Sequence, residues 1–267
     1  MKNFIYCVFV LLLFSKCGNN NSNNLIWEEE FNSIELDTNI WNVYVGNGCP
    51  ELCGFGNNEL QYYTDKDANL KIENGKLIIQ ATFDTAFKSA KLTSSHKIDF
   101  HKGYIEISAK LPSCLGTWPA IWMLPTLNRP LQWPLDGEID IMENVGYNSH
   151  QIFGTIHTSS YNHMNGTQLS DSISVKDPSE VYHTYALNWT DSILEWYVDD
   201  SLYNIIKRKK SDQIEEWPFD KKFHLIINQA VGGNWGGKHG VDTVSYPQLF
   251  YVDYIRLYEK KPIKKPL

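Results

Sequence analysis

The sequence predicts an all-β fold, either a two-sheet sandwich or a barrel. Short apolar runs of strand length recur along its 267 residues, with Gly, Pro and Asn between them. No long stretch repeats its apolar residues every 3.6 positions, as an amphipathic helix would. Beyond an Asn-rich segment near the N-terminus, the chain has no linker and no internal repeat. These observations favour one large β domain over two small ones.

The strands are expected, in chain order, at residues 76–81, 103–110, 120–124, 138–143, 151–157, 182–189, 193–198, 223–230 and 251–258. Segment 103–110 alternates most clearly, because Ile105, Ile107 and Ala109 fall on one face and polar residues on the other. The run from Asp199 to Ser201 predicts a hairpin turn. We expect the basic run 207–210 to be a solvated loop and the tail 260–267 to be frayed.

Charge and composition narrow the class of partner. The formal net charge is −7, which argues against nucleic acid or an anionic polymer. Aromatic residues make up 13% of the chain, so flat apolar side chains are plentiful for a neutral partner. The protein is expected to act as a monomer.

The N-terminus predicts a lipoprotein-type signal peptide over residues 1–16. A short positive start precedes an apolar stretch at 4–14, which is too short to span a bilayer. Cys17 would then be the lipidated first residue, followed by an Asn-rich tether to residue 25. Contact with a membrane is expected only through this anchor. The chain would be exported, as a bacterial outer-membrane or cell-surface lipoprotein, or else secreted or periplasmic. A retained anchor is a further alternative.

Three further cysteines lie in the predicted domain. Cys49 and Cys53 flank a tight segment and could form a disulfide in an exported protein, leaving Cys114 as a thiol. All three could equally be free. Zinc is not expected beside them, because no His or Cys pair has ligand spacing there.

Three acids in segment 138–143 carry most of the functional information. A strand places Glu138 and Asp140 on one face, whereas a regular strand would send Glu143 to the other. A β-bulge at Ile141-Met142 returns Glu143 to the first face. Acids gathered in this way repel one another and resist desolvation, so they indicate acid–base chemistry or a metal site. We call Glu138, Asp140 and Glu143 the acid trio.

Cleavage of a glycosidic bond suits the acid trio. One carboxyl group protonates the leaving oxygen, and the other attacks the anomeric carbon or activates water. Retaining enzymes hold the two groups about 5–5.5 Å apart. Four regular strand steps span roughly 13 Å between α-carbons, so we expect a concave sheet with converging side chains.

Aromatic and polar residues near the trio in the sequence are candidates for sugar binding. Indoles can stack on the apolar faces of sugar rings, and amide or imidazole groups can bind hydroxyls. The alternative for each Trp is that it fills the core. The candidate substrate-binding residues are Asn58, Trp118, Trp122, Trp133, His157, Gln229 and Trp235, with Gln61 and Asn228 as further polar candidates.

The chain resembles glycoside hydrolase family 16, and within it the laminarinase-like endo-β-1,3-glucanases. The similar blocks keep the family's order over residues 26–259, which delimit the predicted domain. They are GNNELQYYT at 56–64, GTWPAIWMLP at 116–125, the segment 133–146, WPFD at 217–220, AVGGNW at 230–235 and VDYIR at 252–256.

The resemblance implies a β-jelly-roll with a substrate cleft on its concave sheet and a retaining mechanism. Glu138 would be the nucleophile, Glu143 the general acid/base, and Asp140 the residue that assists the nucleophile. No cofactor is expected for catalysis, but a structural calcium is implied at Glu30, the carbonyl of Gly75 and Asp253, which suit a hard cation. Glu30 and Asp253 could otherwise be ordinary surface acids.

The resemblance implies hydrolysis of β-1,3-glucan or mixed β-1,3/1,4-glucan. Two alternatives to this function remain open. The same fold and mechanism could act on a sulfated galactan such as agar, porphyran or carrageenan. The domain could also be a non-catalytic lectin, although a pure binding protein has no need of clustered acids.

Overall fold

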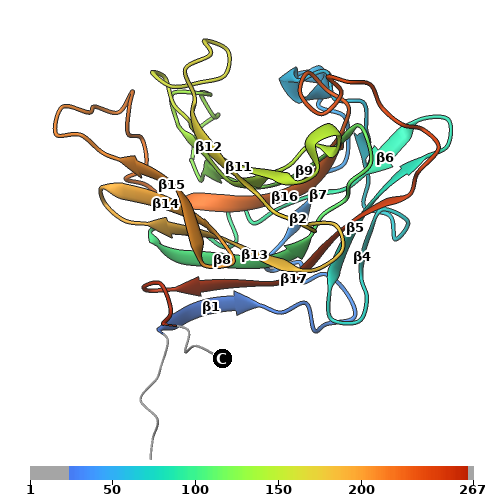
Figure 1. The fold of residues 1–267 in the computed structure, drawn as a ribbon, viewed down its shortest axis with the longest axis horizontal. Coiled ribbons are helices and arrows are strands. Elements are labelled where there is room, and N and C mark those ends of the chain that lie inside the picture. Colours follow the sequence, from blue (N-terminus) through green and yellow to red (C-terminus); the bar gives the residue numbers. More distant parts are fainter. Residues whose placement is uncertain (1–23, 264–267) are drawn as a thin grey trace, which may run out of the picture.

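The structure, a computed structural model, describes residues 24–263 and consists of two β-sheets packed face to face (Figure 1). The ten-stranded sheet contains β1 (Leu25–Glu29), β3 (Tyr62–Tyr63), β4 (Leu70–Ile72), β5 (Leu77–Phe83), β6 (Phe87–Ser89), β8 (Gly103–Lys110), β13 (His183–Trp189), β14 (Ile193–Val198), β15 (Ser201–Lys207) and β17 (Gln248–Tyr258). The seven-stranded sheet contains β2 (Asn42–Val43), β7 (Lys91–Thr93), β9 (Thr117–Pro125), β10 (Glu138–Glu143), β11 (Gln151–His157), β12 (Leu169–Ser174) and β16 (Phe223–Val231).

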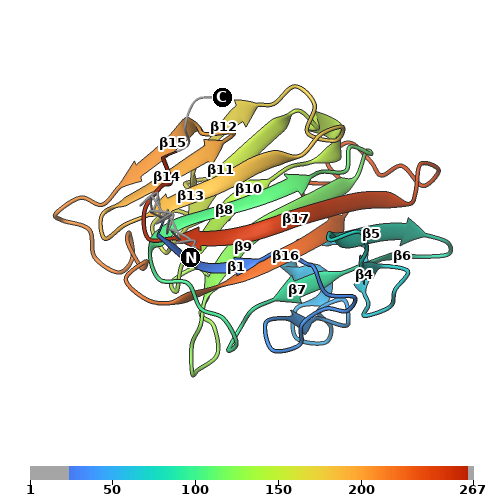
Figure 2. The same ribbon diagram turned by 90° about the horizontal axis from the view of Figure 1, so that it is seen from below.

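The strand order places the predicted active strand near the middle of the smaller sheet. That order is β12-β11-β10-β9-β16-β7-β2, and nearly all neighbours in both sheets are antiparallel. Figure 2 shows β1, β17, β8, β13 and β14 side by side in the larger sheet, which forms the layer opposite the seven-stranded sheet. The helical elements of the described residues are two short 3-10 turns, η1 (Cys53–Gly56) and η2 (Gly146–Asn148).

The core lies between the two sheets and follows the alternation of the strands. Ile105 and Ile107 of β8 and Ile121 and Met123 of β9 belong to one core cluster, and all four are fully buried. Each such side chain contributes about 1.5–3 kcal/mol through removal from water. The alternate residues of β9, β10 and β11 therefore point away from the core, onto the outer face of the seven-stranded sheet. Figure 1 shows this sheet curving, with loops rising beyond its outer face.

The predicted strands are confirmed. Most strands that were not predicted are short or polar, although β1, with the sequence LIWEE, and β15, with SLYNIIK, are neither. β2, β3, β6 and β7 are two or three residues long, too short to show an alternating pattern. β12 has the sequence LSDSIS, in which polar residues outnumber apolar ones. No helix among the described residues is both long and apolar enough to cross a membrane.

The cysteines follow one of the two predicted alternatives. Cys49 and Cys53 form a disulfide, and Cys114 is a free thiol. The predicted signal peptide 1–16, the lipidation site Cys17 and most of the tether lie outside the described residues, as does the end of the C-terminal tail.

Candidate active site

A β-bulge in β10 places the acid trio on one face, as the spacing of the acids predicts. The pairing of β10 with both neighbouring strands shifts register between Asp140 and Glu143. Ile141 and Met142 both belong to the buried core, so the extra residue is absorbed on the inner side. The indole N–H of Trp196, from the opposite sheet, donates to the backbone carbonyl of Asp140 over 2.8 Å. The core therefore anchors the bulge.

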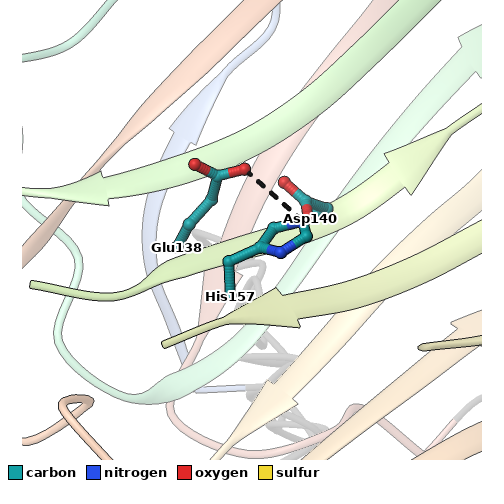
Figure 3. A group of neighbouring side chains, drawn as sticks. All are labelled: Glu138, Asp140 and His157. Carbon is teal, nitrogen blue, oxygen red and sulfur yellow. Dashed lines mark ion pairs between the residues drawn. The ribbon is translucent and has the colours of Figure 1, made fainter. Parts of the chain in front are cut away.

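Glu138 lies between an indole and an imidazole. The Nε1–H of Trp133 donates to Oε2 of Glu138 over 2.8 Å. His157 stands opposite Glu138 on β11, and its Nε2 lies 3.9 Å from Oε1 of Glu138 and 3.5 Å from Oδ2 of Asp140. Figure 3 shows the side chains of Glu138, Asp140 and His157 converging from the two strands. The predicted positions of Trp133 and His157 beside the trio are thus found in the structure.

Glu143 has a separate aromatic neighbourhood. The Nε1–H of Trp118 donates to Oε1 of Glu143 over 3.0 Å. The ring of Trp235 meets Trp118 edge-on, with centroids 5.4 Å apart, and also contacts Phe153 at 5.2 Å. Phe153 stands opposite Glu143 on β11. The glycine-rich segment that carries Trp235 therefore brings this indole to the end of the site that holds Glu143.

Burial raises the pKa of all three acids, but the other influences on them differ. The pKa of Asp140 lies well above its usual range, because the charges of Glu138 and Glu143 add to the effect of burial. The pKa of Glu143 rises to about 7 through burial, and the charges of Glu138 and Glu59 oppose its ionisation further. Burial raises the pKa of Glu138 to about 7 as well, although hydrogen bonds from Trp133 and Asp140 and the charge of Lys91 all lower it.

These influences distinguish the three acids. The raised pKa of Asp140 favours its protonated form, which is the form that can donate to the carboxylate of Glu138. The neighbours of Glu138 favour its carboxylate, whereas the charges beside Glu143 favour its protonated form. His157 is neutral, because burial, and then the neighbouring His163, lower its pKa to about 4. Among the described residues, Glu138, Asp140 and His157 also have ligand atoms close enough to share a metal ion.

Lys91 and Glu59 belong to the site although sequence patterns did not indicate them. Lys91 stands opposite Asn228, and Asn228 stands opposite Ala120, in a row across β7, β16 and β9 that ends at Glu143. The ammonium of Lys91 lies 5.0 Å from the ring centroid of Trp122 and 4.9 Å from that of Phe55. Burial lowers the pKa of Lys91, whereas the charges of Glu59 and Glu138 raise it. β7 is too short for its exposed face to be recognised from the sequence.

Trp122 and Asn58 hold parts of the site together. Trp122 stands opposite Asp140, and its Nε1–H donates to Oδ1 of Asn228 over 2.7 Å. Asn58 donates to Oδ1 of Asn234 over 2.8 Å, which joins segment 57–59 to the loop that carries Trp235. Both candidates therefore lie at the site.

Gln229 is a correction to the sequence prediction. Its side chain is fully buried, and it stands opposite Pro119 of β9, on the inner face of the sheet. Because neighbouring residues of a strand point to opposite faces, Asn228 faces the acid trio and Gln229 cannot. The side-chain oxygen and nitrogen of Gln229 have no hydrogen-bond partner within residues 24–263.

The predicted calcium ligands already have cationic partners. The guanidinium of Arg256 donates to both carboxylate oxygens of Glu30, over 2.6 and 3.0 Å. Lys76 pairs with Asp253 over 2.7 Å. A calcium ion at these carboxylates would have to displace both cations, so the side chains as arranged do not fit it. A Cβ placed on Gly75 would lie 3.5 Å from Oδ1 of Asn32.

Comparisons with known proteins decide the family. The model of glycosyl hydrolases family 16 matches residues 53–248. The chain belongs to this family. It is 42% identical to a beta-glucanase of Rhodothermus marinus over 97% of this chain and 94% of that protein. The predicted membership of family 16, and with it the assignment as a glycoside hydrolase, is confirmed.

Solved structures of family 16 members share the fold. The laminarinase of Rhodothermus marinus superimposes with a TM-score of 0.83 at 42% identity, covering 88% of this chain and 97% of that one. A laminarinase from Flavobacterium sp. UMI-01 gives 0.82 at 42% identity, covering 88% and 99%. The predicted jelly-roll sandwich is therefore confirmed.

Proposed function

We propose that this family 16 enzyme is a retaining endo-β-1,3-glucanase that hydrolyses laminarin-like or mixed β-1,3/1,4-glucans. The acid trio carries the proposal, because its members are similarly buried and yet differ in the charges and donors around them. The names of the similar proteins, beta-glucanase and laminarinase, support the class of substrate.

In the first half of the reaction, the carboxylate of Glu138 attacks the anomeric carbon. The bond from that carbon to the bridging oxygen breaks, and Glu143 transfers its proton to this oxygen. The leaving sugar departs as a neutral alcohol. A glycosyl ester on Glu138 and a carboxylate on Glu143 remain. Asp140 keeps its proton and hydrogen-bonds Glu138 throughout.

In the second half, the carboxylate of Glu143 takes a proton from a water molecule. The water oxygen attacks the anomeric carbon, and the ester bond to Glu138 breaks. Glu138 regains its carboxylate and Glu143 its proton. Two successive inversions leave the anomeric configuration unchanged.

The aromatic residues around the trio support binding of a neutral sugar chain. Trp133 lies beside Glu138, whereas Trp118 and Trp235 lie beside Glu143. We propose that the glucan runs over the outer face of the seven-stranded sheet between these aromatic groups. Its scissile bond would then lie between the two catalytic carboxyl groups.

Product analysis tests this proposal. The protein is incubated with laminarin, lichenan, agarose and porphyran, and the products are identified by mass spectrometry and anomer-resolved NMR. We expect oligosaccharides from laminarin, with the β-anomer released first, and none from agarose or porphyran. The matched control is Glu138→Gln, which should release none. Release of the α-anomer first, or faster cleavage of a galactan, would contradict the proposal.

We also propose that the protein is exported and anchored through lipid on Cys17, and that it works as a monomer. The apolar stretch at residues 4–14 and the cysteine that follows it support export. Mass spectrometry of the N-terminal peptide from membrane fractions should find acylated Cys17, and Cys17→Ser should move the protein to the soluble fraction. An unmodified Cys17 in an exported chain would indicate simple secretion.

A further inference from the structure

One buried carboxylate organises the connection between β9 and β10, which carries Trp133. Asp136 is only 2% exposed. Its two oxygens accept from the Nη1 and Nη2 groups of Arg129 over 2.7 and 2.6 Å, and one of them also accepts the backbone N–H of Gln132 over 2.8 Å. The backbone N–H of Asp136 donates to the carbonyl of Gln132 over 3.0 Å. These bonds close the turn that contains Trp133.

The same carboxylate is joined to a second segment. The ammonium of Lys221, which shortly precedes β16, lies 3.4 Å from Oδ1 of Asp136. Gly137 packs closely against this segment, because a Cβ at this position would lie 2.6 Å from Cγ of Pro218. The turn is therefore held from two sides, by Arg129 within it and by Lys221 across it.

Trp133 connects this turn to the acid trio. Its indole N–H is the donor to Oε2 of Glu138. Its ring also contacts His157 and His163, with centroid distances of 5.9 and 5.0 Å. Asp136 lies two residues before Glu138, but its own side-chain partners are Arg129, Lys221 and the backbone of the turn. The side-chain contacts of Asp136 therefore hold the turn that carries Trp133.

We propose that Asp136 is a positioning residue for catalysis: its ion cluster with Arg129 and Lys221 fixes the turn so that Trp133 donates to Glu138. This inference rests on the nucleophile role proposed for Glu138. Loosening the turn removes a donor that favours the charged form of Glu138. The pKa of Glu138 then rises, and the nucleophile is ionised only at higher pH. The charged and titratable groups that face Glu138 are Asp140 and Glu143 of β10, His157 of β11 and Lys91 of β7.

A double-mutant cycle separates positioning from general stability. We expect Asp136→Asn to lower kcat/KM about tenfold in the wild-type background and less than about twofold in Trp133→Phe, because both changes remove the same interaction. The acid limb of the pH profile of kcat/KM should move to higher pH in Asp136→Asn. Asp220→Asn is the matched control, since it breaks an ion pair with Arg208 in the neighbouring segment.

A spectroscopic readout tests the positioning directly. The indole ¹H–¹⁵N resonance of Trp133 is assigned by its loss in Trp133→Phe. It should shift in Asp136→Asn and stay in place in Asp220→Asn. Arg129→Gln, which removes a half-exposed partner of Asp136, should give the same shift if Asp136→Asn does not fold.

Three results would overturn the inference. They are an unshifted indole resonance, equal losses of kcat/KM in the two backgrounds, and an equal effect of Asp220→Asn. Failure of the proposed function looks different. Full activity in Glu138→Gln would remove the role of the nucleophile, whereas the indole resonance of Trp133 would still respond to Asp136.

Discussion

The two ends of the acid trio have similar burial and opposite surroundings. At one end, the carboxyl group of Glu138 is favoured in its charged form by the indole N–H of Trp133, by a hydrogen bond from Asp140 and by the charge of Lys91. At the other end, Glu143 receives one indole N–H and faces two negative charges, those of Glu138 and Glu59. The comparison shows that one sheet face can surround two glutamates with groups of opposite influence. Burial raises both pKa values to about 7, while the neighbours favour the carboxylate of Glu138 and the protonated form of Glu143.

The largest expected effect separates the two glutamates by role. On laminarin, Glu138→Gln and Glu143→Gln should each lower kcat/KM by roughly 10⁴-fold or more. On an aryl β-glycoside whose leaving group needs no proton, Glu143→Gln should still release a burst of phenol as the ester forms, and Glu138→Gln should not. Stopped-flow absorbance measures the burst. A burst in Glu138→Gln alone would reverse the assignment.

A smaller effect tests the proton on Asp140. Asp140→Asn keeps a donor to Glu138 in nearly the same shape, so kcat/KM should fall only about tenfold. Asp140→Ala removes the donor and should cost about a further tenfold in kcat/KM. Steady-state kinetics on laminarin at pH 6 compare the two variants. If Asn were as harmful as Ala, the donor role of Asp140 toward Glu138 would be wrong.

Removing the cation should weaken the contrast between the two ends. The charge of Lys91 lowers the pKa of Glu138, so Lys91→Met should raise it. The nucleophile must be ionised, and activity should therefore fall at acidic pH, with the acid limb of kcat/KM moved upward by about half a pH unit or more. Lys91→Arg keeps the charge and should restore the limb. An unchanged acid limb in Lys91→Met would show that Lys91 does not act on Glu138.

The smallest expected effect concerns stability. The pKa of Glu143 is raised in the folded state, so its contribution to folding is fully present below about pH 4.5 and is lost as pH rises through about 7. Glu143→Gln removes this dependence and should stabilise the protein at pH 8 by about 1–3 kcal/mol, with little change at pH 4. Thermal unfolding at the two pH values measures the difference. The exposed Glu35 offers a control, since Glu35→Gln should leave the difference unchanged.

The trio and its bulge could be predicted from the sequence because they depend on local rules. Alternation fixes the faces of Glu138 and Asp140, and one extra residue is needed to return Glu143. The same rule, applied to β16, would have prevented the error at Gln229. Asn228 and Gln229 are neighbours in one strand, so only one of them can face the site. Anchoring that strand on Trp122, which bonds Asn228, gives the correct face.

The charges around the trio could not be predicted, because tertiary structure alone brings them there. Lys91 comes from a three-residue strand two positions away from β9 in the sheet, and Glu59 comes from a loop bridged to Gly232. The cationic partners of Glu30 and Asp253 likewise come from distant positions in the chain, so the sequence indicated possible metal ligands where the structure has ion pairs.

The proposed mechanism depends on the order in which the trio ionises, and carboxyl ¹³C NMR measures that order directly. Protein labelled at the side-chain carboxyl carbons of Glu and Asp is titrated, with Glu138→Gln, Glu143→Gln and Asp140→Asn providing the assignments. Glu138 should ionise at lower pH than Glu143, and Asp140 should still be protonated at pH 7. Ionisation of Glu143 before Glu138, or a charged Asp140 at neutral pH, would contradict the proposed roles.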